Sequence, residues 1–246
     1  MRVNFNEVEY VDAHSHLAGF TDDEIERIIK QKILIFAVSY DYSSIFRTID
    51  LAKKFDNIVP FIGIHPWETK NFDLAKLEEI FRLVDEAFGF GEIGLDMRFG
   101  RDYFDKQLKV FEKIVEFAAE HSLPLNIHAL DAWHMTLKII TNHGIKKAIF
   151  HWYSGPIDVL REIEGQGYYI TINPCVRFQK KHSTVLKKAS IEHILTESDG
   201  PYKYRGLDLH PFMVKDLVNY IAQIKGIEEE IVKRQILTNA KKFLQK

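Results

Sequence analysis

The sequence predicts an α/β protein built as a single (β/α)8 TIM barrel. Short apolar runs alternate with amphipathic stretches along the whole chain, as they do in a parallel sheet with helical crossovers. Eight such units in 246 residues match the usual size of this barrel. The alternative is an open, doubly wound sheet, but no glycine-rich phosphate-binding turn follows the first strand-like run.

The eight strand-like runs are short, apolar and bounded by turn-forming or polar residues. In chain order they cover residues 10–14, 33–38, 58–64, 89–93, 125–128, 148–151, 168–172 and 193–196. Amphipathic patterns predict helices over 22–30, 43–55, 74–87, 103–122, 132–143, 157–165, 183–189, 211–223 and 228–243. Thr21 precedes three acidic residues and is expected to cap the first helix. Asp73 is a candidate cap for the third helix, and Gly144 and Gly165 lie where two helices are expected to end.

The composition is that of an ordinary globular protein, and we expect residues 1–246 to form one domain. Apolar residues make up 46% of the chain, enough for a full core. No apolar run reaches the roughly 18–20 residues that span a bilayer. The N-terminus has no signal-peptide core, so we expect a cytoplasmic protein. We expect no membrane contact, and no sequence feature indicates an obligate protein partner. Cys175, the only cysteine, forms no internal disulfide and is more simply a core residue than a ligand.

The charge balance limits how the chain can bind nucleic acid. A net charge of −2 argues against broad, sequence-independent coating, which needs many phosphate contacts. A local basic surface at an active-site mouth is compatible with this balance. Its candidate residues are Arg177, Lys180, Lys181, Lys187, Lys188, Lys203 and Arg205. The alternative is that these are ordinary solvated cations.

A pair of histidines ends the first strand-like run. Because side chains alternate along a strand, His14 and His16 project from the same face and can chelate one cation. Four further candidate ligands lie at the ends of later strand-like runs or just after them: Glu92, His128, His151 and Asp199. The C-terminal strand ends of a barrel share one rim, so we expect all six side chains to converge. Imidazole and carboxylate are the ligands of Zn²⁺, Mn²⁺ and related hydrolytic cations.

Six donors exceed what one tetrahedral zinc requires, so we expect two divalent cations. We expect His14, His16 and Asp199 to bind one cation and His128 and His151 to bind the other. Glu92 is expected to bridge the two cations, because a carboxylate has two oxygens. Two cations about 3.5–4 Å apart stabilise both the attacking and the leaving oxygen and lower the pKa of nearby water. Asp199 is then either the general base or mainly a ligand, because it cannot do both equally well.

Two more polar residues are expected near this rim. His65 follows the third strand-like run and is a candidate to hydrogen-bond a substrate oxygen or a leaving group. With Glu92 and Asp199 it completes the candidate catalytic residues. Asp12 shares the inward face of His14 and is expected to orient an imidazole N–H. The alternative for Asp12 is a hydrogen bond to the backbone.

Substrate contacts are expected from aromatic residues and one arginine. Trp67, Trp152 and Tyr153 lie near loop tips, where they either stack on a base or sugar or pack within the protein. Tyr202 and Arg205 closely follow the last candidate ligand. Arg205 is a candidate fork for an anionic substrate, the alternative being a surface arginine. We take Arg205, Tyr202 and Trp152 as the candidate substrate-binding residues.

Seven short motifs occur in an order that resembles one known family. They are D-A-H-S-H-L at 12–17, G-I-H-P at 63–66, G-E-I-G-L-D at 91–96, L-P-L-N-I-H at 123–128, H-W-Y-S-G at 151–155, T-E-S-D-G-P-Y at 196–202 and N-A-K-K-F at 239–243. Over essentially the whole chain they resemble the TatD-type metal-dependent hydrolases, or TatD deoxyribonucleases, of the amidohydrolase superfamily. The resemblance implies a TIM barrel, a divalent-metal centre on the six residues above, and hydrolysis of phosphodiester bonds in DNA, often from the 3′ end.

Four positions, at three places in the chain, depart from the usual pattern of that family. Leu130 stands where the family has an arginine, Trp152 and Tyr153 replace a Cys-Phe pair, and His210 replaces an asparagine before proline. The metal-ligand positions are unaltered. The departures therefore concern the substrate rather than the metal.

We expect a metal-dependent phosphodiesterase, an exonuclease acting on DNA or RNA ends with Mg²⁺, Mn²⁺ or Zn²⁺. The alternative keeps the site but changes the bond to an amide or ester, including deacylation of aminoacyl-tRNA; the missing arginine at 130 favours it. A phosphoesterase of the polymerase-and-histidinol-phosphatase type also begins with D-x-H-x-H, but the single glutamate of the fourth strand-like run, Glu92, and the E-S-D-G segment at 197–200 fit it less well. A non-catalytic binding protein is disfavoured because all six ligands are present.

Overall fold

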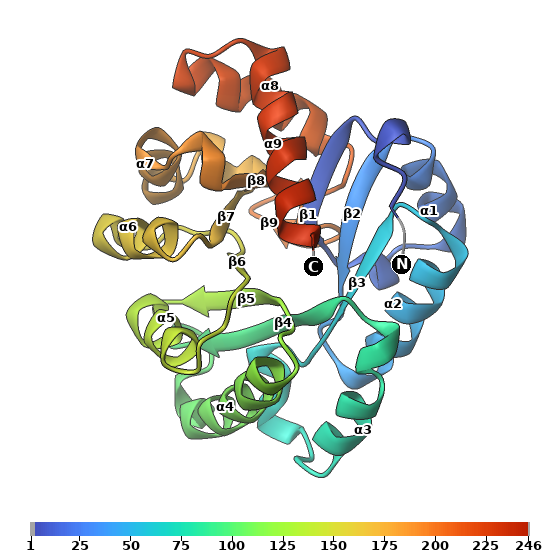
Figure 1. Cartoon of the computed structure of the whole chain (residues 1–246), viewed down its shortest axis with the longest axis vertical. Coiled ribbons are helices and arrows are strands. Elements are labelled where there is room, and N and C mark those ends of the chain that lie inside the picture. Colours follow the sequence, from blue (N-terminus) through green and yellow to red (C-terminus); the bar gives the residue numbers. More distant parts are fainter. Residues whose placement is uncertain (1–2, 246) are drawn as a thin grey trace.

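Eight parallel strands form the barrel that the sequence predicts. The computed structural model describes residues 3–245, and its barrel strands are hydrogen-bonded in chain order (Figure 1). Their bounds are β1 Tyr10–Ser15, β2 Ile33–Val38, β3 Ile58–Ile62, β4 Gly89–Asp96, β5 Leu125–Leu130, β6 Ala148–Phe150, β7 Tyr169–Ile172 and β8 Ile194–Thr196. A doubly wound sheet does not have this sequential strand order, so that alternative is excluded.

The barrel closes between β1 and the segment that follows β8. The backbone N–H of Asp199 donates to the carbonyl of His14 at 2.9 Å, and the N–H of His16 donates to the carbonyl of Gly200 at 2.8 Å. Asp199 has a φ of 61°, in the left-handed region that aspartate tolerates better than most residues. This seam brings the first and the last candidate ligands of the chain side by side.

Helices surround the strands in Figure 1, and a small hairpin lies beyond β8. The helices are α1 Asp22–Ile29, α2 Tyr42–Lys54, α3 Lys76–Arg82, α4 Phe104–Glu120, α5 Trp133–Asn142, α6 Ile157–Gly165, α7 Lys180–Lys188, α8 Met213–Lys225 and α9 Glu229–Leu244. The hairpin consists of β9 Lys203–Tyr204 and β10 Leu207–Asp208. Thr21 caps α1 as predicted, in a reciprocal capping box with Glu24. None of the described helices combines the length and apolar character that crossing a bilayer needs.

Several element boundaries differ from the predicted ones. β4 continues to Asp96, so Glu92 lies within the strand rather than at its end. The predicted helix over 74–87 is divided into α3 and a separate 3-10 turn at Val84–Glu86. Asp73 accepts a hydrogen bond from the N–H of Ala75, ahead of α3 rather than as its cap. α7 begins earlier than predicted, at Lys180.

A close approach between β4 and β5 depends on Gly94. Its φ of 140° is unfavourable for residues with a side chain, and a Cβ there would lie 1.9 Å from the carbonyl oxygen of His128. Gly94 pairs with His128 in the register of these strands. The glycine therefore lets two ligand-bearing strands lie in contact.

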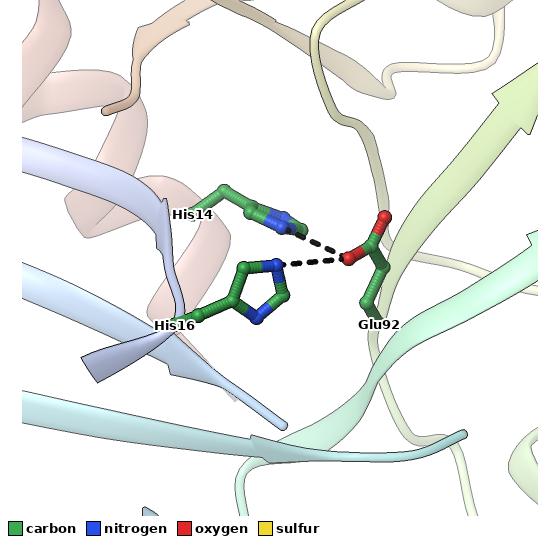
Figure 2. A group of neighbouring side chains, drawn as sticks. All are labelled: His14, His16 and Glu92. Carbon is green, nitrogen blue, oxygen red and sulfur yellow. Dashed lines mark ion pairs between the residues drawn. The ribbon is translucent and has the colours of Figure 1, made fainter. Parts of the chain in front are cut away.

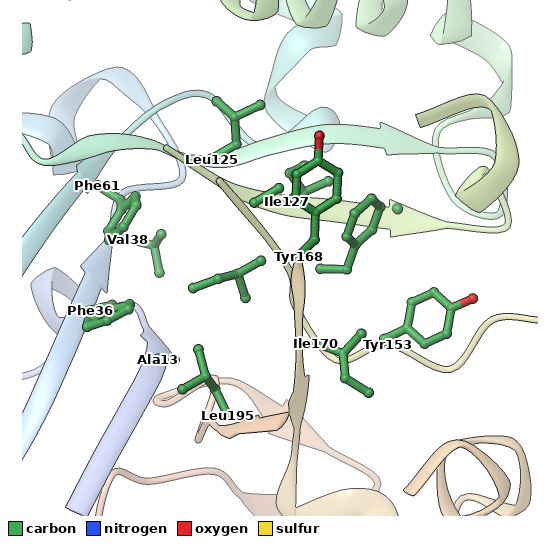
Figure 3. Close-up of a cluster of buried hydrophobic side chains, with 14 of the residues drawn as sticks. Ala13, Phe36, Val38, Phe61, Leu125, Ile127, Tyr153, Tyr168, Ile170 and Leu195 are labelled. Atoms are coloured by element: carbon green, nitrogen blue, oxygen red, sulfur yellow. The ribbon is translucent and has the colours of Figure 1, made fainter. Parts of the chain in front are cut away.

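Buried apolar side chains fill the space inside the strands and between strands and helices. Figure 3 shows Phe36, Phe61, Leu125, Ile170 and Leu195 within this core, and all five side chains are fully buried. Such a core gives the C-terminal rim a rigid support. The candidate ligands lie at this rim.

The opposite end of the barrel is covered by α9. The ring of Phe243 lies 5.9 Å from Phe36, 6.3 Å from Phe61 and 5.9 Å from Tyr169, centroid to centroid. Tyr169 begins β7, so these contacts lie toward the N-terminal strand ends. The end of the chain thus completes the core at the face away from the candidate ligands.

Candidate functional site

A cavity of about 760 Å³ opens at the C-terminal ends of the strands. Among its lining residues are five of the six candidate ligands: His16, Glu92, His128, His151 and Asp199. His14 is fully buried behind them. The structure therefore brings together side chains that are far apart in the sequence.

One group of donors surrounds a single oxygen of Glu92. Its Oε2 lies 3.4 Å from Nε2 of His14 and 3.2 Å from Nε2 of His16. Figure 2 shows both imidazoles pointing at this oxygen, His14 from β1 and His16 from just beyond its end. Oδ1 of Asp199 lies 3.7 Å and 3.4 Å from the same two nitrogens. These are the residues that the sequence assigns to one cation.

A second group surrounds the other oxygen of Glu92. Its Oε1 lies 2.8 Å from Nδ1 of His128 and 2.8 Å from Nε2 of His151. The two imidazole nitrogens are 3.2 Å apart. Glu92 thus presents one oxygen to each of the two expected ligand sets.

The far nitrogens of the β1 histidines are bound to acceptors. Nδ1 of His14 lies 2.8 Å from Oδ1 of Asn126, whose amide NH2 donates to the carbonyl of Ala13. That donation fixes the amide so that its oxygen faces the imidazole. Nδ1 of His16 lies 3.0 Å from the carbonyl of Val38. In the neutral form that binds a cation, both imidazoles therefore carry their proton on Nδ1 and direct the lone pair of Nε2 toward Glu92.

The histidines of the second group have carboxylates behind them. Nε2 of His128 lies 3.1 Å from Oδ2 of Asp96, so its Nδ1 offers the lone pair toward Glu92. Nδ1 of His151 lies 3.6 Å from Oε2 of the fully buried Glu197. This distance is too long for a hydrogen bond, but the carboxylate favours a proton on that nitrogen.

The donor set fits divalent cations. Nε2 of His14 is buried and has no hydrogen-bond partner among the described residues, which is costly unless something else binds it. Donors about 2.0–2.2 Å from one tetrahedral zinc lie roughly 3.3–3.6 Å from one another. The distances from His14 and His16 to Glu92 and Asp199 span 3.2–3.7 Å. Nitrogen and carboxylate oxygen are also the ligand types these cations prefer.

His65 differs from the four ligand histidines because its protonated nitrogen, not its lone pair, faces the site. Its Nδ1 accepts a hydrogen bond from the backbone N–H of Trp67 at 3.1 Å, so its Nε2 carries the proton. That Nε2 lies 3.3 Å from Oε1 of Glu92 and 3.3 Å from Nδ1 of His128. His65 is therefore placed beside the second group as a hydrogen-bond donor rather than as a lone-pair ligand.

The pKa directions in the site follow from burial and from charge pairing. Burial alone would raise the pKa of Glu92, but the neighbouring histidines hold it well below its ordinary value. Burial alone would lower the pKa of His16, but Asp199 and Glu92 raise it to about 10. Burial lowers the pKa of His65 to about 4, despite the nearby charge of Glu92. His65 is thus neutral near pH 7, as the acceptor role of its Nδ1 toward the N–H of Trp67 requires.

Two of the expected substrate residues, Tyr202 and Arg205, lie exposed at the mouth of the cavity. Tyr202 is 42% exposed, and both it and Arg205 line the cavity. Arg205 and Gly206 both have positive φ and form the turn of the β9–β10 hairpin. The Arg205 guanidinium lies over the ring of Tyr204 at 5.4 Å and pairs with no described carboxylate. Trp152 also lines the cavity, with its indole N–H donating to Gln179.

For the other residues of this rim, the structure supports the simpler of the two alternatives. Asp12 does not orient an imidazole; it accepts hydrogen bonds from the backbone N–H and the hydroxyl of Ser198 and so holds the loop before Asp199. The tyrosine at position 153 is 1% exposed and cannot stack on a substrate. Of the seven candidates for a basic surface at the mouth, only Arg205 lines the cavity, and the others are exposed cations, as the alternative has it. Cys175 is buried, and burial raises the pKa of its thiol to about 12.

Sequence reasoning missed three polar residues that support the ligands: Asp96, Asn126 and Glu197. Asn126 lies two positions before His128, and Glu197 lies two positions before Asp199. Asp96 lies four positions after Glu92 on the same strand. Side chains two or four apart on a strand share a face, so the rule that singled out Asp12 applies to Asn126 on β5 and Asp96 on β4, whereas Glu197 follows the end of β8.

Comparisons with known proteins show which family and fold the chain resembles. A family model described as TatD related DNase matches residues 11–245. An uncharacterized metal-dependent hydrolase of Methanocaldococcus jannaschii is 30% identical, over 98% of this chain and 98% of that protein. A putative deoxyribonuclease tatdn3 of Danio rerio is 28% identical, over 96% of this chain and 97% of its own length. Among solved structures, the TatD homologue YJJV of Escherichia coli superimposes with a TM-score of 0.87 at 18% identity, covering 96% of this chain and 98% of that one.

Proposed function

Because the chain belongs to the TatD-related DNase family and is a metal-dependent hydrolase, we propose that it cleaves phosphodiester bonds at the ends of nucleic acid strands. The observation that carries the proposal is the arrangement around Glu92. One of its oxygens faces His14 and His16, and the other faces His128 and His151. This is the donor arrangement expected for two divalent cations bridged by one carboxylate.

The ligand residues have defined tasks in this proposal. His14, His16 and Asp199 hold one cation, and His128 and His151 hold the other. Glu92 bridges the two sets. Bound divalent cations supply positive charge that lowers the pKa of water and stabilises the charge developing on a phosphate. Zn²⁺, Mn²⁺ and Mg²⁺ are the candidates.

Two side chains are placed to move or hold a proton. Asp199 lines the cavity and turns Oδ1 toward the imidazoles of β1, so its carboxylate can accept a proton from water entering at that point. His65 holds its proton on Nε2, beside Oε1 of Glu92. It can donate a hydrogen bond to a substrate oxygen that approaches the second group.

The rim supports an anionic substrate with aromatic bases. Arg205 offers a guanidinium that no described carboxylate neutralises, whereas the Arg98 guanidinium is bound to both oxygens of Asp131 at 2.7 Å. Arg205 is therefore the better placed of the two to bind a phosphate. Tyr202 and Trp152 offer ring faces on the same side of the cavity for stacking on a base.

The proposal is tested with purified protein and single-stranded DNA and RNA oligonucleotides labelled at either end. Mg²⁺, Mn²⁺ and Zn²⁺ are supplied in turn after chelation of any bound metal. We expect stepwise shortening from one end, abolished by Glu92→Gln and retained by Glu112→Gln, which alters an exposed glutamate on α4. Oligonucleotides left intact by every cation across a range of pH would refute a nucleic acid substrate.

A second candidate is hydrolysis of an amide or ester by the same centre, including deacylation of aminoacyl-tRNA. The observation that favours it is the apolar wall beside His128, where Ala129, Leu130 and Trp133 line the cavity. No cation projects from that wall, and the nearby Arg98 is paired with Asp131. Acyl esters, acyl amides and aminoacyl-tRNA assayed in parallel with the oligonucleotides separate the two candidates.

A further inference from the structure

Asp96 connects the second ligand group with the rim of the cavity. The residue is fully buried at the end of β4. Its Oδ2 accepts a hydrogen bond from Nε2 of His128 at 3.1 Å and another from the indole N–H of Trp67 at 2.7 Å. Its Oδ1 accepts from the backbone N–H groups of Arg98 and Phe99, both at 2.8 Å. One carboxylate thus contacts a ligand, an aromatic residue of the rim, and the loop that carries two more rim residues.

The backbone of Asp96 is held as firmly as its side chain. Its N–H donates to Oε1 of Gln107 at 2.7 Å, and the Gln107 amide donates to the carbonyls of Asp96 at 3.2 Å and Gly100 at 2.8 Å. Gln107 is fully buried on α4. The Asp96 carboxylate therefore cannot turn away without breaking several buried hydrogen bonds, each costly to leave unmade.

We propose that Asp96 is a positioning residue that dictates which nitrogen of His128 meets the cation and ties that imidazole to Trp67 at the rim. With Nε2 protonated toward Asp96, His128 presents Nδ1 to the cation. His14, His16 and His151 all present Nε2 instead. His128 is therefore distinguished from the other three ligand histidines by its coordinating nitrogen. The inference rests on the proposed two-cation centre but not on the nature of the substrate.

The substitution Asp96→Asn tests this mechanism by turning one acceptor into a donor. The N–H groups of Arg98 and Phe99 hold the amide oxygen on their side, so the amide NH2 faces His128 and Trp67. Nε2 of His128 would then meet a donor instead of an acceptor. The imidazole is expected to accept through Nε2 and to carry its proton on Nδ1, where the cation needs a lone pair. The size of the side chain is unchanged, but the indole N–H of Trp67 also loses its acceptor, so circular dichroism is used to check that the variant is folded.

Titration calorimetry with Zn²⁺ or Mn²⁺ alone measures the consequence. We expect two binding events in metal-free wild-type protein. In Asp96→Asn one of them should weaken by about ten- to a hundredfold, as loss of a partner behind a ligand histidine typically does, while the other is retained. The matched control is Asp158→Asn, which alters an exposed aspartate that lies 3.3 Å from Nε2 of His134 on the outer helices. Its two affinities should equal those of the wild type.

A second measurement needs no variant. In wild-type protein loaded with ¹¹³Cd²⁺ and labelled with ¹⁵N-histidine, metal–nitrogen couplings identify the coordinating nitrogens. We expect one histidine bound through Nδ1 with Nε2–H, and the others bound through Nε2. Coordination of all of them through Nε2 would overturn the inference even if Asp96→Asn fails to fold.

The outcomes separate this inference from the proposed function. Wild-type protein that binds a single cation would refute the two-cation centre. Whether one or two cations bind, cation affinities that are unchanged in Asp96→Asn would overturn the role of Asp96. Loss of one affinity in Asp96→Asn together with intact oligonucleotides would support Asp96 while refuting the nucleic acid substrate.

Discussion

Oδ1 of Asn126 lies 2.8 Å from Nδ1 of His14, and the two side chains join β5 to β1 across the interior of the barrel. The other half of the amide donates to the carbonyl of Ala13, next to His14 in the chain. The amide therefore cannot rotate to offer its NH2 to the imidazole. Asn126 thereby leaves Nε2 of His14 unprotonated and aimed at Glu92 and Asp199.

Replacing Asn126 by alanine should weaken cation binding without disrupting the fold. The imidazole of His14 would lose its fixed orientation and its fixed proton, so the affinity of one cation should fall about ten- to a hundredfold. Calorimetric titration of metal-free protein measures the change. Asn219→Ala, at an exposed position on α8, is the matched control and should bind cations as the wild type does. An affinity unaltered in Asn126→Ala would show that His14 needs no such partner.

Glu92→Gln should weaken cation binding and activity more than loss of Asn126 or Asp96, the residues that orient the ligand histidines. The bridging carboxylate becomes neutral, and one of its two positions becomes an amide NH2 that cannot bind a cation. We expect kcat to fall by at least about a hundredfold, and the metal content after dialysis to drop below that of the wild type. Circular dichroism checks that the variant is folded. Wild-type activity in this variant would remove the central element of the proposed site.

Arg205 and Arg98 should differ in their contribution to substrate binding. A charge-assisted hydrogen bond contributes about 1.5–3 kcal/mol, so Arg205→Ala should raise KM for an oligonucleotide roughly ten- to a hundredfold with a smaller change in kcat. Arg98→Ala should change KM less, because Asp131 already occupies both sides of that guanidinium. Steady-state kinetics at two salt concentrations measure both. Equal effects of the two substitutions would contradict the distinction.

Local patterns in the sequence suffice for the barrel and for the convergence of the ligands. Alternation of apolar runs with amphipathic stretches predicts the order of strands and helices, and parallel strands share one C-terminal rim. The division of ligands between the two oxygens of Glu92 also follows from chemistry, since a carboxylate offers two acceptors. These inferences need no knowledge of how neighbouring strands are aligned.

The side-chain contacts that could not be predicted depend on how neighbouring strands are aligned or on the conformation of single turns. Asn126 meets His14 only because β5 and β1 face each other across the barrel at that height. The proton on His65 is set by a backbone N–H two residues further on, in a turn that apolar patterning does not describe. Arg98 is neutralised by Asp131 from the loop after β5, a pairing between two loops with no sequence pattern. Such contacts come from register and loop conformation.

Phe243 should be important for stability but not for catalysis. Its ring packs against Phe36, Phe61 and Tyr169 at the end of the barrel away from the candidate ligands. Phe243→Ala should lower the free energy of unfolding by about 3–5 kcal/mol, as loss of a large buried aromatic side chain does. Urea denaturation measures this loss. At a temperature where the variant remains folded, kcat should match that of the wild type.

The buried His182 should make the stability of the protein depend on pH. Its Nδ1 lies 2.7 Å from the carbonyl of Tyr153, and its Nε2 accepts a hydrogen bond from the backbone N–H of Asn173 at 3.0 Å. Both ring nitrogens are thus satisfied in the neutral form. A second proton would have to displace the N–H of Asn173. Burial lowers the pKa of His182 from 6.5 to about 4.

The sign of the effect follows from proton binding in the two states. Between pH 6.5 and pH 4 the unfolded chain takes up a proton at this histidine and the folded protein does not, so stability falls as the pH falls. At about 1.4 kcal/mol per pKa unit, the loss approaches about 3 kcal/mol. His182→Gln cannot bind that proton, so its urea-denaturation free energy should fall less steeply than that of the wild type between pH 7 and pH 4.5. His143→Gln, at an exposed position, should retain the wild-type slope. Parallel slopes in wild-type protein and His182→Gln would show that this histidine is not kept neutral by the fold.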